Sequence, residues 1–246
     1  MSEPISNGKL EVVGVGPGDP ELMTLKAARL IEAADVIAYP TNSDGQSFAR
    51  DIAASHLSEQ VEIGFYLPMR TERAPAQIAY EGACGKIAAE LDAGRAVVLL
   101  CEGDPFFYGS AMYVFARLAE TYPVSVTPGI SSLTACAAAI GRPLASRSDV
   151  LSVIPATLDE DRLREAISKA DSMAIIKVGR YFSKVCHILE ELGRAQQAVV
   201  IESATLNAER ISLLDGFAED ERPYFSTILV GPTTESFVRL PGAKLS

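Results

Sequence analysis

Three short segments combine glycine, proline and polar side chains in a pattern suited to ligand binding. They are Gly14-Val-Gly-Pro-Gly-Asp-Pro20, Cys101-Glu-Gly-Asp-Pro-Phe-Phe-Tyr-Gly-Ser110 and Thr127-Pro-Gly-Ile-Ser-Ser132. Glycines let a backbone approach a ligand closely, and carboxylates and hydroxyls supply hydrogen-bonding groups. Each segment follows an apolar stretch typical of a β-strand, and open α/β sheets bind ligands at the carboxyl ends of their strands. The segments therefore indicate a site for a small polar ligand.

The first segment has the composition of a nucleotide-binding loop but not its full pattern. Its glycines are spaced GxGxG, Pro17 has no amide hydrogen to donate, and Pro20 intervenes before the following helix. A dinucleotide-binding fold would also place an acid at the end of its second strand, where this chain has Tyr39-Pro40. No GKS or GKT follows, so it is not a P-loop. A ligand-binding loop and a tight turn without a ligand both remain open.

The second and third segments carry side chains that could act on a ligand. Asp104 either offers its carboxylate to a ligand or caps the following helix, the commoner use of such an aspartate. Phe106, Phe107 and Tyr108 belong either to the core or to one wall of a pocket. In the third segment two serines precede an alanine-rich stretch, which predicts a helix N-terminus with free amides and hydroxyls.

The elements that position these segments alternate between strand and helix in the first half of the chain. We expect strands at 10–15, 35–39, 61–65, 95–101 and 124–127, and helices at 24–34, 47–57, 76–92 and 108–121. In the first helix Ala27, Leu30, Ile31 and Ala34 fall on one face, with Thr24 as the N-cap. Strand and helix in alternation predict a mostly parallel sheet covered on both faces.

The second half has a different order of elements. We expect helices at 132–140, 159–170 and 182–192, and strands at 150–154, 172–177, 198–202, 210–214 and 225–230. The last two strands have no helix between them, which predicts a mixed sheet with an antiparallel part. The chain thus reads as an α/β protein of two packed domains, 1–128 and 129–246.

Composition and charge limit the classes of function. The chain has 246 residues, 48% of them apolar, and a net charge of −10, which argues against nucleic acid or an anionic membrane as the main partner. Its four cysteines and two histidines form no metal-binding or disulfide pattern, so we expect no metal. The N-terminus lacks the features of a signal peptide, and no apolar run is long enough to span a membrane. We expect a soluble, cytoplasmic protein.

Taken in order, the three segments resemble the motifs of the tetrapyrrole (corrin and porphyrin) methylase family. The matching sequences are GVGPGDPELMTLKA, EGDPFFYGS and TPGISS, and the resemblance runs over nearly the whole chain. It implies two α/β domains with S-adenosyl-L-methionine folded into the cleft between them, and a homodimer. It also implies a C-methyltransferase whose substrate is a polycarboxylate tetrapyrrole.

The resemblance assigns functional positions residue by residue. The implied cofactor contacts are Pro17, Glu102, Gly103, Asp104, Phe107, Ser131, Ser132, Val178, Ala204 and Thr227. Methylation of a ring carbon leaves a proton that a base must remove. The implied catalytic residues are Glu102, Asp104 and Tyr108, with Asp19 as a further candidate base, and the sequence does not choose among them; water or a substrate carboxylate is the alternative acceptor.

A segment after the second strand points to a subfamily. Here the chain reads DVIAYPTNSDGQSFARDIA, with Gly45, Ser47 and Ala49 opening a helix, which is similar to precorrin-2 C(20)-methyltransferases. Uroporphyrinogen-III methylases instead carry an acid after the tyrosine and a glycine in place of Glu102. The resemblance implies methylation of the meso carbon C-20 of precorrin-2 in cobalamin biosynthesis. Cobalt-precorrin-2 or uroporphyrinogen III as substrate, a nucleotide-binding oxidoreductase, and a cofactor-binding regulator without turnover remain alternatives.

Such a substrate would need positive charge around it. A protein of net charge −10 repels a polycarboxylate at long range, so binding requires a local basic lining in which arginine can pair with carboxylates. The candidates are Arg70, Arg73, Arg142, Arg147, Lys177, Arg180 and Lys184. For each of them, ordinary solvated surface charge is the competing interpretation.

Overall fold

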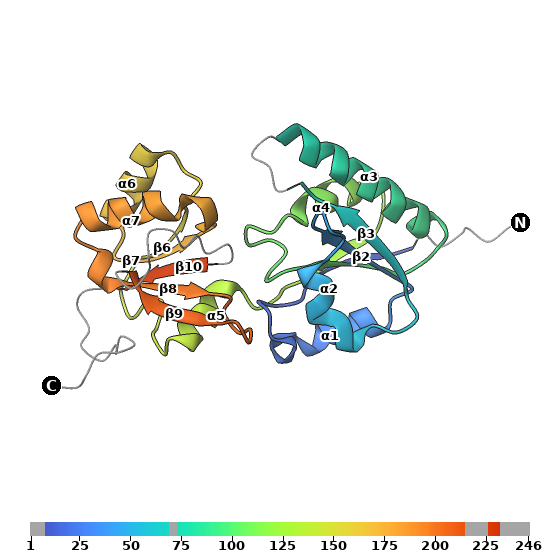
Figure 1. Ribbon diagram of the computed structural model, residues 1–246. Helices are drawn as coiled ribbons and strands as arrows, with labels where there is room; N and C mark the ends of the chain where they lie inside the picture. The colour runs from blue at the N-terminus through green and yellow to red at the C-terminus, as the bar shows by residue number, and fades with distance from the viewer. Residues whose placement is uncertain (1–7, 69–72, 215–225, 232–246) are drawn as a thin grey trace, which may run out of the picture. The chain divides into compact units, whose positions relative to one another are not determined.

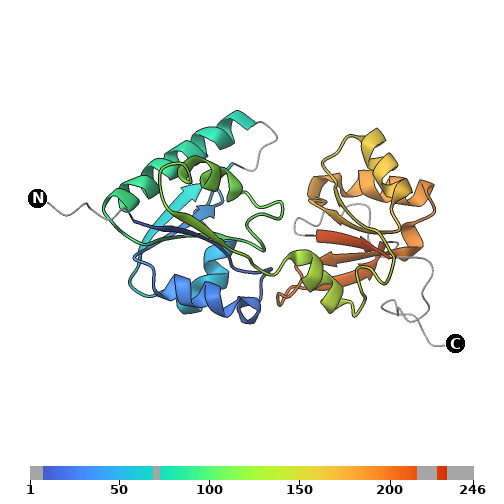
Figure 2. The ribbon, with the colours of Figure 1, turned by 180° about the vertical axis from the view of Figure 1, so that it is seen from behind.

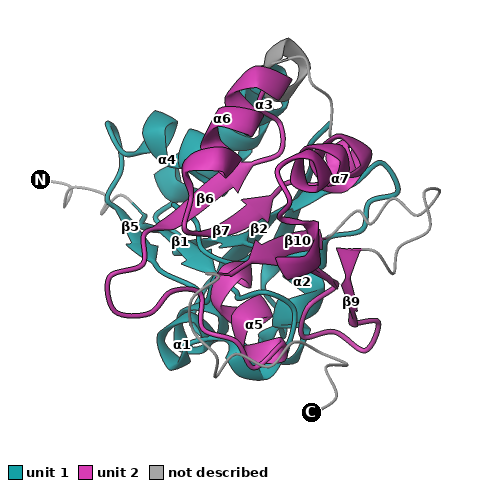
Figure 3. Cartoon of the chain, turned by 90° about the vertical axis from the view of Figure 1, so that its left-hand side faces the viewer, with its two compact units in different colours: residues 1–131 teal, residues 132–246 magenta. Residues whose placement is uncertain are grey.

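The chain divides into two compact units, each built around its own five-stranded sheet (Figures 1 and 3). The computed structural model describes residues 8–68, 73–214 and 226–231. The units divide between Ser131 and Ser132, shortly after the boundary expected from the sequence.

The sheet of the first unit is entirely parallel, as its alternating pattern predicts. Its strands are β1 (Leu10–Gly14), β2 (Val36–Thr41), β3 (Val61–Tyr66), β4 (Val97–Cys101) and β5 (Val124–Thr127). They are ordered β3-β2-β4-β1-β5, so the carboxyl ends of all five lie at one edge of the sheet. Pro40 is tolerated in β2 because the pairing of β2 with β4 ends at Ala38, so its missing amide hydrogen is not needed by β4.

Helices cover both faces of this sheet (Figures 1 and 2). They are α1 (Leu25–Glu32), α2 (Phe48–Ala53), α3 (Arg73–Asp92) and α4 (Met112–Leu118). Helices α1 and α2 pack on one face through residues such as Ala27, Ile31 and Ile52, whereas α3 and α4 pack on the other. The Thr24 side chain accepts a hydrogen bond from the Ala27 amide, which confirms the predicted N-cap.

The start of α4 differs from the prediction. The sequence predicts a helix from residue 108, but the helix begins at Met112. Tyr108 has a φ of 57°, in the left-handed region, and a residue in that conformation cannot continue a right-handed helix. The segment before α4 is therefore a turn.

The second unit contains a mixed sheet, also as predicted. Its strands are β6 (Leu151–Pro155), β7 (Ser172–Ile176), β8 (Ala198–Glu202), β9 (Arg210–Leu213) and β10 (Ser226–Val230), and its helices are α5 (Ser132–Ala139), α6 (Glu160–Lys169) and α7 (Phe182–Glu191). The strand order is β6-β7-β10-β8-β9, and β10 is antiparallel to both of its neighbours. The last two strands do not pair with each other, because β8 lies between them.

Helices cover both faces of this second sheet as well. Helices α6 and α7 pack on one face and α5 on the other. Short 3-10 helices complete the fold at Pro20–Leu22, Ala54–His56, Gly179–Tyr181 and Ala195–Gln197. Within the described part of the chain, no helix is both long and apolar enough to cross a membrane.

Candidate active site

The carboxyl edge of the first sheet has the topology of a ligand site. Strands β1 and β4 are neighbours, yet β1 leads to α1 on one face and β4 leads through its loop to α4 on the other. Connections that leave adjacent parallel strands towards opposite faces open a crevice, the usual place for a ligand in an open α/β sheet. The three glycine-rich segments follow β1, β4 and β5 at this point.

Three glycines hold these segments in direct backbone contact. A methyl group placed on Gly129 would lie 2.0 Å from the Gly103 carbonyl oxygen, and one on Gly14 would lie 2.5 Å from the same atom. The Gly103 amide donates to the Gly16 carbonyl at 2.8 Å, and the Gly16 amide donates to the Gly103 carbonyl at 3.3 Å. No side chain fits at this junction, so the site is lined by backbone groups.

The first segment does not form a dinucleotide-binding turn. Helix α1 begins only at Leu25, after a 3-10 turn, whereas a dinucleotide fold places the helix N-terminus directly at the glycines. Gly16 has a φ of 88°, and Pro17 is half-buried. The Asp19 carboxylate accepts a hydrogen bond from the Glu21 amide at 2.9 Å, so this candidate base caps the turn.

Asp104 ties the second segment to the third. Its Oδ1 accepts from the Phe106 amide at 2.9 Å, and its Oδ2 accepts from the Gly129 amide at 3.1 Å. Each carboxylate oxygen therefore already receives a backbone hydrogen bond. This arrangement suits a residue that positions the loops better than one that accepts a proton from a substrate.

Replacing Asp104 with asparagine tests that role. One oxygen becomes an NH₂ group, which cannot accept from an amide, so we expect S-adenosylmethionine affinity to fall about tenfold, the value of one charge-assisted hydrogen bond. The pH dependence of methyl transfer should stay unchanged. Calorimetric titration and rate–pH profiles measure the two effects. If S-adenosylmethionine affinity were unchanged and the rate of methyl transfer no longer fell at low pH, Asp104 would instead be the proton acceptor.

Glu102 differs from the other candidate acids. It is exposed to solvent, and its carboxylate makes no hydrogen bond to any residue in the described ranges. The atoms around it nevertheless desolvate it enough to raise its pKa above the ordinary value for glutamate. A carboxylate that is accessible, without hydrogen bonds and of raised pKa has the properties of a general base.

The aromatic residues of the second segment lie outside the core. Phe106, Phe107 and Tyr108 are 51%, 38% and 42% exposed, which excludes the interpretation that they are core residues. The Phe107 and Tyr108 rings meet edge to face with centroids 5.3 Å apart. The left-handed backbone of Tyr108 costs about 1–2 kcal/mol, and strain of this kind concentrates at functional sites.

Replacing Tyr108 with glycine separates strain from function. Glycine adopts a positive φ freely, so we expect the free energy of unfolding, measured with urea, not to decrease. We expect kcat/KM for methyl transfer to fall about tenfold because the aromatic side chain is lost from the site. A less stable variant with wild-type activity would show that Tyr108 serves the fold alone.

The second unit carries the predicted site residues Ser132, Val178, Ala204 and Thr227, and Ser131 is the last residue of the first unit. Strands β6, β7 and β8 run in the same direction, so the residues after them share one edge. Val178 follows β7, but its side chain is fully buried in the core. Ala204 follows β8 and packs against a core cluster formed by α5 and the strands. Thr227 is buried, and its hydroxyl hydrogen-bonds to the Cys136 thiol. Ser131 is half-buried, and Ser132 is the exposed first residue of α5.

This edge of the second sheet also holds strained residues that the sequence does not reveal. Lys177, Ser203 and Thr205 have φ values of 56°, 50° and 71°. All three follow β7 or β8, beside the predicted positions Val178 and Ala204. Nothing in a lysine, serine or threonine signals a left-handed backbone, because the surrounding structure imposes it.

The structure divides the basic candidates between the two edges of the second sheet. Arg142 donates to the Gln197 carbonyl just before β8, and Arg147 lies in the turn before β6. Both therefore lie at the amino edge of the sheet, opposite the edge that carries the predicted cofactor contacts. Lys184 donates to the Leu158 carbonyl and lies 4.8 Å from the Tyr181 ring at the carboxyl edge. At that same edge are Lys177 and Arg180. Arg70 and the side chain of Arg73 lie outside the described residues.

Within residues 8–68, 73–214 and 226–231, no group of three or more histidine, cysteine, aspartate or glutamate side chains could hold a metal ion. Burial raises the pKa of the Cys101 thiol, at the end of β4, to about 12. That thiol is therefore protonated and a poor nucleophile at neutral pH.

Comparison with known proteins places the chain among methylases. The family model of tetrapyrrole (corrin/porphyrin) methylases matches residues 9–215. The chain belongs to the tetrapyrrole methylase family. This membership sets aside the nucleotide-binding oxidoreductase that the glycines of the first segment left open.

Two relatives of this methylase are similar to it over almost their full lengths. A precorrin-2 C(20)-methyltransferase from Sinorhizobium sp is 40% identical over 232 residues, covering 91% of this chain and 95% of the relative. A cobalt-precorrin-2 C(20)-methyltransferase from Salmonella typhimurium is 31% identical, covering 93% and 98%. The structure of uroporphyrin-III C-methyltransferase from Thermus thermophilus, complexed with S-adenyl homocysteine, has a TM-score of 0.66 at 24% identity, covering 91% and 97%.

Proposed function

We propose that this tetrapyrrole methylase transfers a methyl group from S-adenosylmethionine to C-20 of precorrin-2 in cobalamin biosynthesis. The observation that carries the proposal is the 40% identity with a precorrin-2 C(20)-methyltransferase over nearly the full length of both chains. The interlocked glycine segments and the exposed Glu102 support it, because they supply a built site at the expected edge of the sheet.

The residues of the first unit fit S-adenosylmethionine. A methyl group on Gly14 or Gly129 would collide with the Gly103 carbonyl oxygen, so these glycines let the three segments pack backbone against backbone and present no side chain of their own to a ligand. Pro17, Gly103 and Phe107 would hold the cofactor there. When bound, it supplies an electrophilic methyl group on a sulfonium. We propose further that the protein holds no resident metal, that it lies in the cytoplasm, and that it forms a homodimer. The family resemblance implies the homodimer, and analytical ultracentrifugation tests it.

The chain itself has to align the reactants and remove one proton. Holding a nucleophilic ring carbon in line with a methyl donor contributes up to about 7–11 kcal/mol of the barrier. Glu102 is the proposed acceptor of the proton that leaves the methylated carbon, because its carboxylate is accessible whereas Asp104 and Asp19 accept backbone hydrogen bonds. Asp104 is the proposed positioning residue for the loops.

The decisive experiment mixes the purified protein with S-adenosylmethionine and enzymatically prepared precorrin-2. Mass spectrometry should find one added methyl group, and NMR with a labelled methyl should locate it at C-20. Two methyl groups added to uroporphyrinogen III instead would contradict the proposed substrate. S-adenosylmethionine binding without methyl transfer to any tetrapyrrole would favour a regulator.

Cobalt-precorrin-2 is the second candidate substrate. The observation in its favour is the 31% identity with a cobalt-precorrin-2 C(20)-methyltransferase over 93% of this chain. Competition between the two substrates in one reaction measures the ratio of their kcat/KM values. We expect the metal-free substrate to be preferred, in line with the greater identity to the precorrin-2 enzyme.

A further inference from the structure

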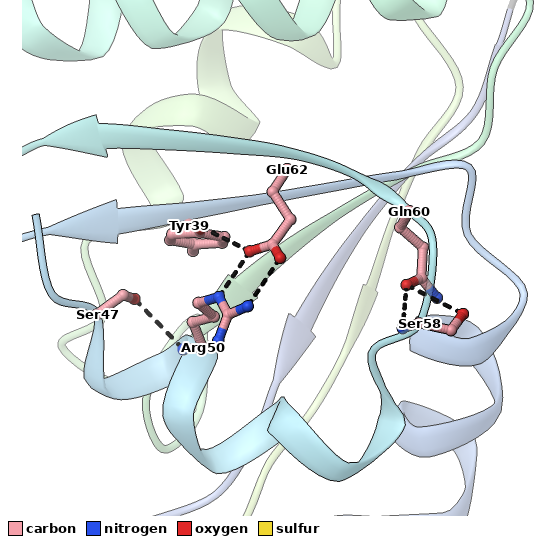
Figure 4. Close-up of polar contacts among 6 residues, drawn as sticks. All are labelled: Tyr39, Ser47, Arg50, Ser58, Gln60 and Glu62. Atoms are coloured by element: carbon pink, nitrogen blue, oxygen red, sulfur yellow. Dashed lines mark hydrogen bonds and ion pairs between the residues drawn. The ribbon is translucent and has the colours of Figure 1, made fainter.

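Three side chains from consecutive elements of the first unit form one hydrogen-bonded cluster (Figure 4). Tyr39 lies on β2, Arg50 on α2 and Glu62 on β3. Arg50 donates to Glu62 twice, from Nε to Oε2 at 2.6 Å and from its terminal nitrogen to Oε1 at 2.8 Å. The Tyr39 hydroxyl donates to the same Oε2 at 2.6 Å. We call Tyr39, Arg50 and Glu62 the clamp.

The hydrogen bonds of the clamp fix the orientations of its side chains as well as the distances between them. A bidentate arginine–carboxylate pair orients both planar groups, and the tyrosine hydroxyl orients the shared oxygen further. Hydrogen bonds from Arg50 and Tyr39 outweigh desolvation and lower the pKa of Glu62, so the carboxylate is charged at neutral pH. The Tyr39 ring is buried, and it passes over Gly64, where a methyl group would lie 3.3 Å from a ring carbon.

The clamp joins the two ends of one loop. Strand β2 ends at Thr41, two residues after Tyr39, and residues 42–47 lead from it into α2, whose N-cap Ser47 lies about one turn before Arg50. At the end of this loop the Ser47 side chain caps α2 by accepting from the Arg50 amide at 3.3 Å. Inside it, the Asn42 side chain accepts from the amides of Asp44 and Gln46, both at 2.9 Å. The conformation of the loop is therefore set by its own turn and by the clamp.

The loop lies at the edge of the sheet that carries the candidate site. It follows the carboxyl end of β2, and β2 is the direct neighbour of β4, whose carboxyl end carries Glu102. Among its exposed polar residues, Asn42 donates to the Gln46 side-chain carbonyl and Ser43 donates to Asp44. The Gln46 amide group and the second Asn42 amide hydrogen remain to donate hydrogen bonds to carboxylates. Because the clamp fixes the conformation of this loop, it also affects the binding of a ligand next to the loop.

We propose that Tyr39, Arg50 and Glu62 are positioning residues that hold the 42–47 loop in place for binding the tetrapyrrole substrate. This inference rests on the proposed function for the identity of the substrate. It assigns the clamp to tetrapyrrole binding and not to S-adenosylmethionine binding, because the glycine segments make none of its contacts.

A similar ion pair elsewhere in the same unit provides the matched control. Arg95 donates to Glu90 at 2.7 Å, and the two side chains are 46% and 24% exposed, against 37% and 33% for Arg50 and Glu62. Arg95 precedes β4, so this pair lies at the amino edge, away from the candidate site. If an ion pair acts only through stability, Arg50→Lys and Arg95→Lys should behave alike.

The test measures KM for precorrin-2, kcat and the S-adenosylmethionine dissociation constant in the full-length protein. In Arg50→Lys and Tyr39→Phe we expect KM to rise about tenfold while S-adenosylmethionine affinity stays within about twofold, because only the loop is displaced. The two changes should be less than additive in the double variant, since they act on one carboxylate. Arg95→Lys should leave all three values unchanged.

Two results would overturn the inference. One is a KM in Arg50→Lys and Tyr39→Phe no higher than in Arg95→Lys. The other is an equal loss of affinity for S-adenosylmethionine and for the substrate, which would indicate that the whole fold is disturbed. Tyr39→Phe keeps the buried aromatic ring, so this variant is expected to fold. If the wild-type protein methylates another tetrapyrrole, the same comparison is made with that substrate. Absence of methyl transfer by the wild-type protein contradicts the proposed function, not the clamp.

Discussion

The Gly129→Ala variant is expected to bind S-adenosylmethionine about 100-fold more weakly than the wild-type protein, because forcing an extra methyl group into a packed site costs about 1–3 kcal/mol, and each 1.4 kcal/mol is tenfold in affinity. The new methyl group would lie 2.0 Å from the Gly103 carbonyl oxygen and 2.9 Å from two Gly14 backbone atoms. All of these obstacles are backbone, so no side chain can rotate away. The segments must separate, and the hydrogen bond from the Gly129 amide to Asp104 is strained with them.

Isothermal titration calorimetry measures this loss, and Gly82→Ala supplies the control. Gly82 lies on α3 with open space around it, so alanine there meets nothing within 4 Å. We expect that variant to keep wild-type affinity and to gain about 0.5–1 kcal/mol of stability, because alanine favours a helix. Wild-type affinity in Gly129→Ala would contradict the assignment of the glycine junction to cofactor binding.

The Glu102→Gln variant is expected to lose a factor of about 10²–10⁴ in kcat, the usual contribution of a general base. Glutamine keeps the size of the side chain but cannot accept the proton. A general base acts only in its ionised form, so kcat of the wild-type protein is expected to fall as the pH falls through the Glu102 pKa. Desolvation raises that pKa above about 4.3, the value for an ordinary glutamate. The fall in kcat should therefore occur at a higher pH than for an unperturbed glutamate.

Single-turnover rates across a pH series check this expectation. The acid limb should disappear in Glu102→Gln, while S-adenosylmethionine still binds. Glu120→Gln is the matched control, because Glu120 is exposed and precedes β5 at the opposite edge of the sheet. A Glu102→Gln enzyme with wild-type kcat would assign the proton to water or to a carboxylate of the substrate.

The sequence by itself determined the secondary structure and the segments that meet at the site. Periodicity located the strands and most helices because burial of one face imposes a repeat on local residue choice. The Thr24 cap could be predicted because its partner, the Ala27 amide, is three residues away. The motif order also indicated the family, which the family model confirms over residues 9–215.

Residues whose role depends on distant neighbours could not be assigned in this way. Arg142 was a candidate for substrate binding by charge alone, yet the fold places it at the amino edge of its sheet, bonded to the Gln197 carbonyl. The helix predicted from residue 108 starts later because Tyr108 is held in a left-handed conformation. Neither residue type carries a local signal of these outcomes.

Only the tertiary structure decided how the site is built. Gly14, Gly103 and Gly129 are far apart in the sequence, and each alone reads as a turn residue; their contact exists because β4, β1 and β5 are adjacent in the sheet. The same adjacency places the Asp104 carboxylate where it accepts a hydrogen bond from the Gly129 amide. Local patterns record which face of an element is buried, but strand order brings separate loops together, and that order is set by packing over the whole sheet.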